Sequence, residues 1–180
     1  MDGVILVTGS TGFIGSRLVN TLIGQGRRVR VLLRPESRSV SSASHRAGVE
    51  EVRAAYGDAE ALGRAVSGVT SIIHLAGVTK AVDEAGFLAG NVTPVENLLE
   101  VVKRRNPGLR RFLLVSSLAA MGPASSPSPG VRESDRPSPV SAYGRSKLLG
   151  EEAARRYAGS VPLSIVRPPA VYGPGDRDIL

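Results

Sequence analysis

The chain has 180 residues, of which 42% are hydrophobic and 22% charged, which is typical of an ordinary globular protein with one domain rather than two. It contains no cysteine, which excludes disulfides and thiolate metal sites, and no apolar run approaches the roughly 20 residues of a membrane span. The net charge of +7 could suggest a nucleic-acid-binding protein, but the basic residues are spread out and mixed with acids, and only 4% of the residues are aromatic, which argues against that function.

Apolar runs that end in glycine, proline or polar residues predict six strands, at residues 4–9, 27–34, 49–58, 69–77 and 161–169, and within residues 110–122 before Ser116. Apolar residues at helical spacing lie between these runs and predict helices at residues 13–23, 59–68, 85–105 and 141–159. Asp58 is placed to cap the second helix, and Pro94 predicts an irregularity early in the third.

Two loops stand out between these elements. The serine-rich stretch at residues 35–48 is expected to hold a short helical turn. The proline-rich stretch at residues 123–140 is too long for a simple connection, which points to a functional loop.

The alternation of strands with helices predicts an α/β fold with a parallel sheet. Each strand is a nearly continuous apolar run, as in strands that helices cover on both faces. Right-handed crossovers then favour a doubly wound, nucleotide-binding sheet, formed as a single domain over residues 1–180. Ligands of such sheets bind beyond the carboxyl ends of the strands.

The turn between the first strand and the first helix carries Gly9, Gly12 and Gly15 at the spacing G-x-x-G-x-x-G. Gly9 would allow the tight exit from the strand, Gly12 a close approach of a pyrophosphate, and Gly15 close packing of the helix on the sheet. The amides that begin the helix would then face the phosphates. The alternative is a turn that uses glycine for packing alone, but its place at the first strand–helix junction favours dinucleotide binding.

The end of the second strand distinguishes NAD from NADP. An acidic residue there would accept hydrogen bonds from the adenosine ribose and would repel a 2′-phosphate. This strand ends in Arg34, with Arg38 nearby and no acid before Glu36. Because arginine suits a phosphate through charge-assisted contacts, we predict NADP rather than NAD, the alternative being a solvated arginine.

The third and fourth strands also end in candidate contacts. Asp58 could touch the adenine amino group as well as cap its helix. Ala76 and Gly77 are small enough for the cofactor backbone to pass close by. His74 lies within an apolar strand and is predicted to be a packed core histidine rather than a catalyst.

Tyr143 and Lys147 lie four residues apart and so share one face of a helix. A free tyrosine has a pKa near 10, but a nearby ammonium group would favour the phenolate, so that Tyr143 could exchange a proton with a substrate hydroxyl. Lys147 could also hold ribose hydroxyls, and Ser116 and Ser117 supply hydroxyls beyond the fifth strand. A surface pair on a helix is the alternative, and the combination with the glycine turn argues against it.

With these motifs in place, the chain resembles the extended short-chain dehydrogenase/reductase family, whose members include NAD(P)-dependent epimerases, dehydratases and reductases. The resemblance covers nearly the whole chain and rests on "VTGSTGFIG", "GDAEAL", "IIHLAG", "NVTPVENLLE", "VSSLAAMG", "ESDRPSPVSAYGRSK" and "VRPPAVYGPGD", in the family's order. It implies an NAD(P)-binding Rossmann fold and a small-molecule substrate. The composition adds the expectations of a cytoplasmic location and of no membrane, nucleic-acid or metal partner.

The resemblance also implies residue roles. Ser117 would be the catalytic hydroxyl, Tyr143 the acid/base and Lys147 its partner, while Asn91 would stabilise the active-site helix. The cofactor contacts that it implies are Gly9, Thr11, Gly12, Phe13, Ile14, Gly15, Arg34, Asp58, Ala59, Leu75, Ala76, Gly77, Val115, Tyr143, Lys147, Pro168 and Val171.

Several expectations about the whole protein follow from the resemblance. The chain departs from the family pattern at three places. It has "HLAG" where "HLAA" is usual, Pro94 where glycine is frequent, and Arg34 where NAD-preferring members have an acidic residue. Arg34 favours the reductase branch, similar to dihydroflavonol reductases and hydroxysteroid dehydrogenases, over nucleotide-sugar epimerases and dehydratases. Family dimers pair the helix at Asn91–Arg105 with the Tyr143 helix, so a homodimer is plausible.

Members of this type are longer and carry a C-terminal substrate domain and a seventh strand, so we expect this chain to be a fragment without them. A cofactor-sensing module with unused chemistry and a basic scaffold or RNA-associated protein remain as alternatives. The intact set of Ser117, Tyr143 and Lys147 argues against a sensor, and the low aromatic content argues against the scaffold.

Overall fold

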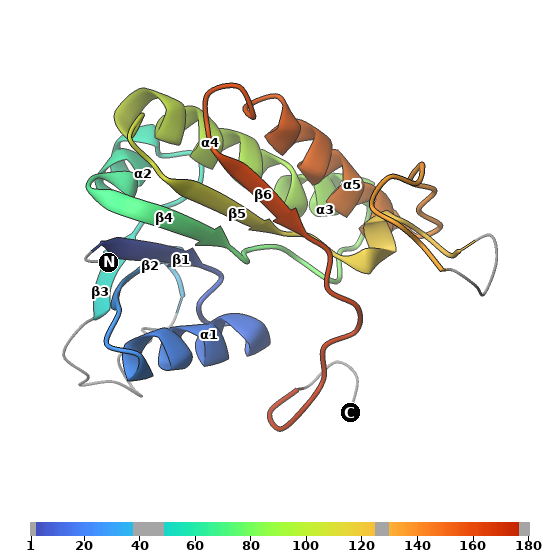
Figure 1. Cartoon of the computed structure of the whole chain (residues 1–180), viewed down its shortest axis with the longest axis horizontal. Coiled ribbons are helices and arrows are strands. Elements are labelled where there is room, and N and C mark those ends of the chain that lie inside the picture. The colour runs from blue at the N-terminus through green and yellow to red at the C-terminus, as the bar shows by residue number, and fades with distance from the viewer. Residues whose placement is uncertain (1–2, 38–48, 125–129, 177–180) are drawn as a thin grey trace.

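Six parallel strands form the centre of the molecule, in the order β3-β2-β1-β4-β5-β6 (Figure 1). The structure is a computed structural model that describes residues 3–37, 49–124 and 130–176. The strands are β1 (Val4–Thr8), β2 (Arg28–Leu33), β3 (Val49–Arg53), β4 (Val69–His74), β5 (Arg111–Val115) and β6 (Leu163–Val166). The predicted doubly wound parallel sheet is confirmed.

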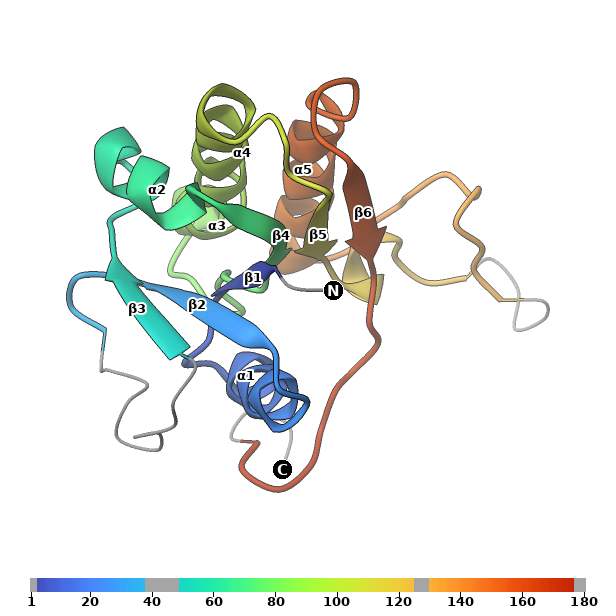
Figure 2. The same cartoon turned by 60° about the vertical axis from the view of Figure 1, so that its left-hand side comes forward.

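Helices cover both faces of this sheet. They are α1 (Phe13–Gly24), α2 (Ala59–Val66), α3 (Glu84–Asn91), α4 (Thr93–Arg105) and α5 (Ala142–Arg155), with a 3-10 turn, η2, at Leu118–Ala120. Figures 1 and 2 show α1 alone on one face, and α2, α4 and α5 together on the other. Within the described ranges, no helix combines the length and the apolar character that a membrane crossing requires.

Each face of the sheet has its own hydrophobic core. On the face of α2 and α4, the larger cluster includes the fully buried side chains of Leu62, Leu98 and Phe112. On the face of α1, a smaller cluster joins Val19 to Val7 and other strand residues. Strand residues alternate between the two clusters, as expected for a sheet that is buried on both sides.

The predicted single helix at residues 85–105 is in fact two helices. The helix is interrupted at Val92, which is the C-cap of α3 and the N-cap of α4. Pro94 lies in the first turn of α4, where a missing backbone N–H costs no intrahelical hydrogen bond. The break leaves Asn91 at the end of α3, beside the carboxyl ends of the strands.

One predicted strand is shorter than expected, because β3 ends at Arg53 rather than near Asp58. β5 ends at Val115, so Ser116 and Ser117 lie directly beyond it, as predicted. After β5 the Ser117 hydroxyl accepts a hydrogen bond from the Ala119 amide at 3.2 Å, which turns the chain into η2. The predicted helical turn in the serine-rich loop lies mostly outside the described residues.

The order of the strands fixes where a ligand can bind. β1 pairs with β2 on one side and with β4 on the other, so the chain direction of the crossovers reverses between β1 and β4. In open α/β sheets a crevice forms at this point, beyond the carboxyl ends of the strands. The residues that follow Thr8, His74 and Val115 therefore meet there.

Candidate cofactor and active site

A cleft of about 740 Å³ lies at this reversal point. Predicted site residues that line it are Gly9, Gly12, Phe13, Ile14, Gly15, Leu75, Gly77, Asn91, Val115, Ser117, Tyr143, Lys147 and Val171. Thr11 borders a neighbouring hollow instead. Five other predicted contacts follow the strands at the same edge of the sheet but do not line the cleft: Arg34, Asp58, Ala59, Ala76 and Pro168.

Two glycines of the turn are required by packing. Gly9 has φ +69°, and a Cβ there would lie 2.7 Å from the backbone nitrogen of Ala76. A Cβ on Gly15 would run into the carbonyl of Gly9. The packing role that sequence alone left open is therefore present at both positions, and it brings the start of α1 close to β1.

The third glycine leaves the start of α1 open. Gly12 is the N-cap of α1 and offers no side-chain cap, and the first turn carries no acidic residue. The unpaired amides and the positive end of the helix dipole are thus available to an anion. With apolar walls from Phe13, Ile14 and Leu75 beside this anion-binding end, the cleft fits an elongated dinucleotide.

The predicted adenosine-end residues are held at the surface. The Asp58 carboxylate accepts a hydrogen bond from the Ala61 amide at 2.9 Å, which caps α2 as predicted. Arg34 has a side chain that is 67% exposed, with its Nε 3.3 Å from Glu36 Oε1. The Arg53 guanidinium donates to the carbonyls of Pro35 and Ser37 at 3.0 and 2.8 Å, which fixes the loop that Arg34 begins.

Helix α5 brings Tyr143 and Lys147 to the other end of the cleft. Lys147 is 9% exposed, and its ammonium donates to the Val115 carbonyl at 2.9 Å. Burial lowers the pKa of Lys147 to about 8, and the negative charge of Glu151 opposes this decrease. The Tyr143 ring lies 6.4 Å from the ring of Phe87, centroid to centroid. A partly desolvated cation and a phenol thus share the cleft with the Ser117 hydroxyl.

Asn91 connects the loop after β4 to helix α5. Its amide oxygen accepts from the Val78 amide at 2.9 Å, and its Nδ2 donates to the Val78 carbonyl at 3.0 Å and to Ser146 Oγ at 2.9 Å. Ser146 in turn donates to the Tyr143 carbonyl at 2.7 Å. A Cβ on Gly77 would lie 2.7 Å from Asn91 Oδ1, so glycine is needed beside this hub.

His74 is a core residue, as predicted. It is 1% exposed, lies 6.0 Å from the rings of both Tyr56 and Phe112, and places Nδ1 2.9 Å from Thr8 Oγ1. Burial lowers the pKa of His74 to about 3, with the charge of Lys147 acting in the same direction. The imidazole is therefore neutral near pH 7.

The segment after β6 lies along the cleft. Pro169, Ala170 and Val171 line it, whereas the carbonyl of Pro168 accepts a hydrogen bond from the Leu118 amide at 2.9 Å. Of the two adjacent prolines, the one singled out from sequence is therefore the one that anchors the segment. Arg167, directly before these prolines, was not predicted as a site residue. Its position next to them was the only feature of the sequence that could have pointed to it.

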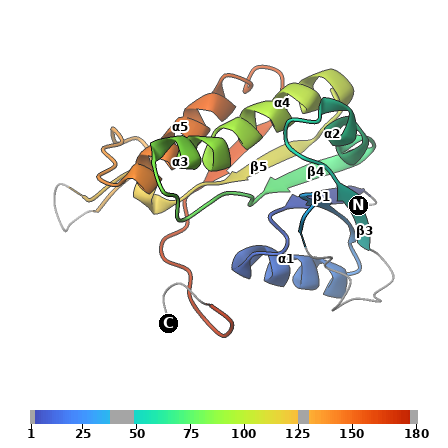
Figure 3. The same cartoon turned by 180° about the vertical axis from the view of Figure 1, so that it is seen from behind.

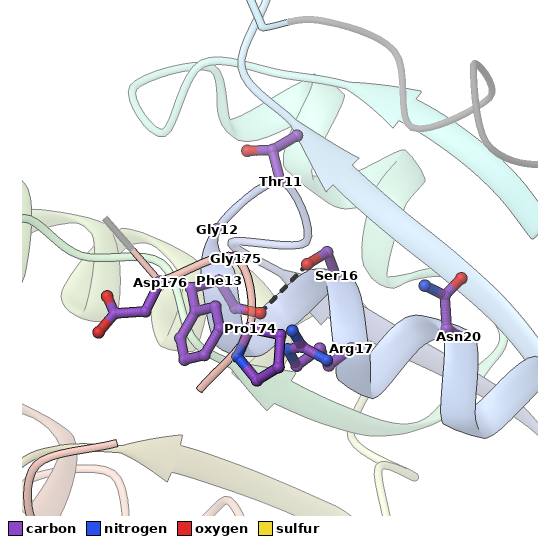
Figure 4. Close-up of a pocket in the computed structure, with 9 residues that line it drawn as sticks. All are labelled: Thr11, Gly12, Phe13, Ser16, Arg17, Asn20, Pro174, Gly175 and Asp176. Atoms are coloured by element: carbon purple, nitrogen blue, oxygen red, sulfur yellow. Dashed lines mark hydrogen bonds between the residues drawn. The ribbon is translucent and has the colours of Figure 1, made fainter. Parts of the chain in front are cut away.

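A second hollow of about 580 Å³ lies on the outer side of α1 (Figure 4). The Arg17 guanidinium stands 5.1 Å from the centre of the Phe13 ring, and Ser16 Oγ donates to the Phe13 carbonyl at 3.1 Å. Asp176 borders both this hollow and the cleft. The segment at residues 167–176 therefore runs from β6 toward the start of α1 (Figure 3) and contributes to the lining of both spaces.

Known proteins resemble the chain over nearly all of its length. A model of the NAD dependent epimerase/dehydratase family matches residues 5–179. The ceramide reductase of Caulobacter vibrioides is 38% identical over 178 residues, which are 99% of this chain and 49% of that protein. The chain spans about half the length of the curated relatives it matches.

Solved structures agree with this result. MoeE5 in complex with UDP-glucose and NAD has a TM-score of 0.80 at 30% identity, over 99% of this chain and 58% of that one. The UDP-glucuronic acid 4-epimerase of Bacillus cereus in complex with NAD has a TM-score of 0.84 at 26% identity, over 98% of this chain and 59% of that one.

Proposed function

The chain belongs to the NAD-dependent epimerase/dehydratase family, and we propose that it forms the cofactor-binding and catalytic part of an NAD(P)-dependent oxidoreductase. The reaction would move hydride between the nicotinamide and a substrate carbon that carries a hydroxyl or carbonyl oxygen. The observation that carries the proposal is a single cleft that joins the uncapped start of α1 to Ser117, Tyr143 and Lys147.

Different residues of the cleft would bind different parts of the cofactor. The first-turn amides of α1 would bind the pyrophosphate, and the small residues after β4 would let its backbone pass. Lys147 would hold ribose hydroxyls, and Val171 would lie against the nicotinamide end. When bound, the cofactor would supply the carbon that gives or takes hydride.

Proton transfer falls to the chain's own side chains. Tyr143 would give a proton to the substrate oxygen in reduction and take it back in oxidation. The ammonium of Lys147, held by the Val115 carbonyl, would stabilise the phenolate that forms. Ser117 would donate a hydrogen bond to the same substrate oxygen and so orient it.

A reductase of apolar alcohols or ketones is the function that we favour. The relative at 38% identity is named a ceramide reductase, which supports a carbonyl or hydroxyl on a largely apolar molecule. Leu118 and Val171 line the cleft and expose 42% and 40% of their surface, which suits an apolar substrate. A nucleotide-sugar epimerase is the second candidate, supported by the likeness to MoeE5 with UDP-glucose.

Cofactor balance separates the two candidates. In one assay the protein is incubated with NADPH or NADH and a long-chain ketone. In a parallel assay it is incubated with UDP-glucose and a catalytic amount of the cofactor. A reductase consumes one reduced cofactor for each ketone, whereas an epimerase converts the sugar without net consumption. In a full-length version that carries a substrate domain, saturable cofactor binding with neither activity would favour a cofactor-sensing module instead.

The Tyr143→Phe variant is the matched control for either activity. It removes only the phenolic hydroxyl of a residue on the cleft wall. We expect turnover to fall by about 10²–10⁴-fold, the usual contribution of a positioned acid or base, with the dissociation constant of the cofactor little changed. Turnover at the wild-type rate would refute the role of Tyr143.

A further inference from the structure

Glu151 is a fully buried carboxylate on α5, one turn after Lys147. It has 0% exposure, and its two oxygens accept from the Arg167 guanidinium at 2.8 and 2.6 Å. Arg155, which is half exposed, lies 3.3 Å from the same carboxylate. A buried charge persists only when it is paired and hydrogen-bonded, and the bidentate contact with Arg167 meets that need.

The position of Glu151 connects two walls of the cleft. Tyr143, Lys147 and Glu151 are spaced four residues apart, so they follow one face of α5. Arg167 is the first residue after β6, which lies beside α5 in Figure 1. Directly after it, Pro168 accepts from the Leu118 amide, and the next three residues line the cleft. The ion pair therefore ties the catalytic helix to the segment beside the nicotinamide end.

Glu151 is charged near pH 7 and acts on Lys147. Burial alone would raise the pKa of Glu151, but the hydrogen bonds and charge of Arg167 outweigh it, so that the net shift is downward. Burial lowers the pKa of Lys147 to about 8, and Glu151 counteracts that decrease. Both effects are the ordinary ones of desolvation and of an opposite charge nearby.

Other charged or titratable groups also surround Lys147. From the elements packed around it, or from the walls of the same cleft, these are Tyr143 on α5, His74 on β4, Lys80 after β4 and Asp176 near the C-terminus. On α4, Glu96 pairs with Arg156 and Glu100 with Arg104, at the far end of α5.

We propose that Glu151 is a positioning residue of the active site: paired with Arg167, it fixes the segment after β6 against α5 and supplies the buried negative charge that keeps Lys147 cationic. This inference rests on the proposed function, in which Lys147 acts as a cation beside Tyr143. Glu151 does not line the cleft, so its effect would pass through Lys147 and Arg167.

The lysine content of the chain makes a direct test practical. Lys80, Lys103 and Lys147 are its three lysines, so a protein labelled with ¹³C at lysine Cε gives few side-chain signals, which Lys→Arg variants assign. The chemical shift of each signal, followed against pH, gives the titration midpoint of that lysine. This measurement needs neither cofactor nor turnover, so its failure is distinct from a failure of the proposed function.

In Glu151→Gln, which keeps the shape and removes the charge, we expect the midpoint of Lys147 to fall from about 8 by about one pH unit. Glu151→Asp, which keeps the charge, should restore most of that change. Glu152→Gln is the matched control, because it removes a neighbouring carboxylate that is exposed. It should leave the midpoint of Lys147 unchanged, as should each variant for Lys80 and Lys103.

If Glu151→Gln alone does not fold, the double variant Glu151→Gln/Arg167→Gln removes both charges and leaves no unpaired ion in the core. The midpoint of Lys147 should fall in this variant too. An unchanged midpoint in a folded variant without the Glu151 charge, or an equal fall in Glu152→Gln, would overturn the proposal.

Discussion

Among single residues, Arg34 is the one on which the predicted preference for NADP over NAD rests. Its side chain follows β2, is 67% exposed, and lies against Glu36 with 3.3 Å between Nε and Oε1. A pair this exposed contributes little to stability, so Arg34 can turn toward another anion at small cost. Solved relatives bind NAD, and the preference for NADP stays a prediction from sequence.

Replacing Arg34 with alanine tests that preference. We expect Arg34→Ala to weaken NADP binding by about 10-fold or more, the usual worth of a charge-assisted hydrogen bond, and NAD binding by less. Calorimetric titration of both cofactors measures the difference. Glu36→Gln is the paired control and should strengthen NADP binding, because it removes a competing carboxylate. Equal weakening of both cofactors in Arg34→Ala would contradict the phosphate contact.

At the scale of elements, the junction of β1 and α1 depends on backbone contact rather than on side chains. Gly15 lies inside α1, yet its Cα faces the Gly9 carbonyl so closely that no Cβ fits. Gly24, the last residue of the same helix, has open space where a methyl group would stand, with no atom within 4 Å. The two glycines therefore have opposite roles in one helix.

Alanine at these two positions should have opposite effects. Gly15→Ala forces β1 and α1 apart, and we expect a loss of about 1–3 kcal/mol in the free energy of unfolding, together with weaker cofactor binding. Gly24→Ala should gain up to about 1 kcal/mol, because alanine favours the helix. Urea denaturation of both variants measures this contrast. A neutral Gly15→Ala would show that the junction can relax.

The sequence predicted the strands and helices well because hydrophobic periodicity reports burial directly. It could not predict where β3 ends, because "AAY" continues the strand pattern while the backbone turns there, with the Asp58 amide donating to the Ala55 carbonyl at 3.0 Å. Pro94 marked the region of the helix break, but proline fits equally in a kink or in the first turn of a new helix.

The residues of the candidate site also differ in how well the sequence predicts them. The glycine turn, Tyr143 and Lys147 could be found because their chemistry depends on local spacing. Glu151 could not, because a glutamate in a polar helix reads as solvent-exposed, and its partner Arg167 is 16 residues away in sequence. Only the packing of α5 beside β6 brings the two charges together.

At the scale of the whole molecule, the two faces of the sheet are covered unequally. One face carries α2, α4 and α5 over the larger core, and the other carries α1 alone, with the segment at residues 172–176 running toward its start. The predicted dimer through α4 and α5 stays a prediction. Both cores contribute to global stability, and buried titratable groups such as His74 and Glu151 make that stability depend on pH.

His74 gives that dependence a direction. Its pKa in the folded protein is about 3, whereas a histidine in an unfolded chain titrates near 6.5. As the pH falls below about 6.5, the unfolded state binds the proton first, so the free energy of unfolding should decrease until the pH approaches 3. Glu151, with its lowered pKa, loses its stabilising contribution in a more acidic range.

Denaturation of wild type and His74→Asn between pH 7 and pH 5 isolates the histidine, because these conditions lie above the ordinary carboxylate range. We expect the wild type to lose stability steadily over this interval and the variant to change much less. His45 is present in both proteins, so its contribution cancels when the two are compared. Equal slopes would show that His74 is not the group responsible.

We propose that the cleft at the carboxyl ends of β1, β4 and β5 binds a nicotinamide dinucleotide. Titration of the ¹⁵N-labelled chain with NAD⁺ and NADP⁺, followed by amide NMR, tests it most directly. We expect saturable shifts at Gly12–Gly15, Leu75–Val78 and Val115–Ser117, with the amino ends of the strands, such as Arg28 and Arg111, unaffected. Saturable binding that maps elsewhere, or no saturation with either cofactor, would contradict the account.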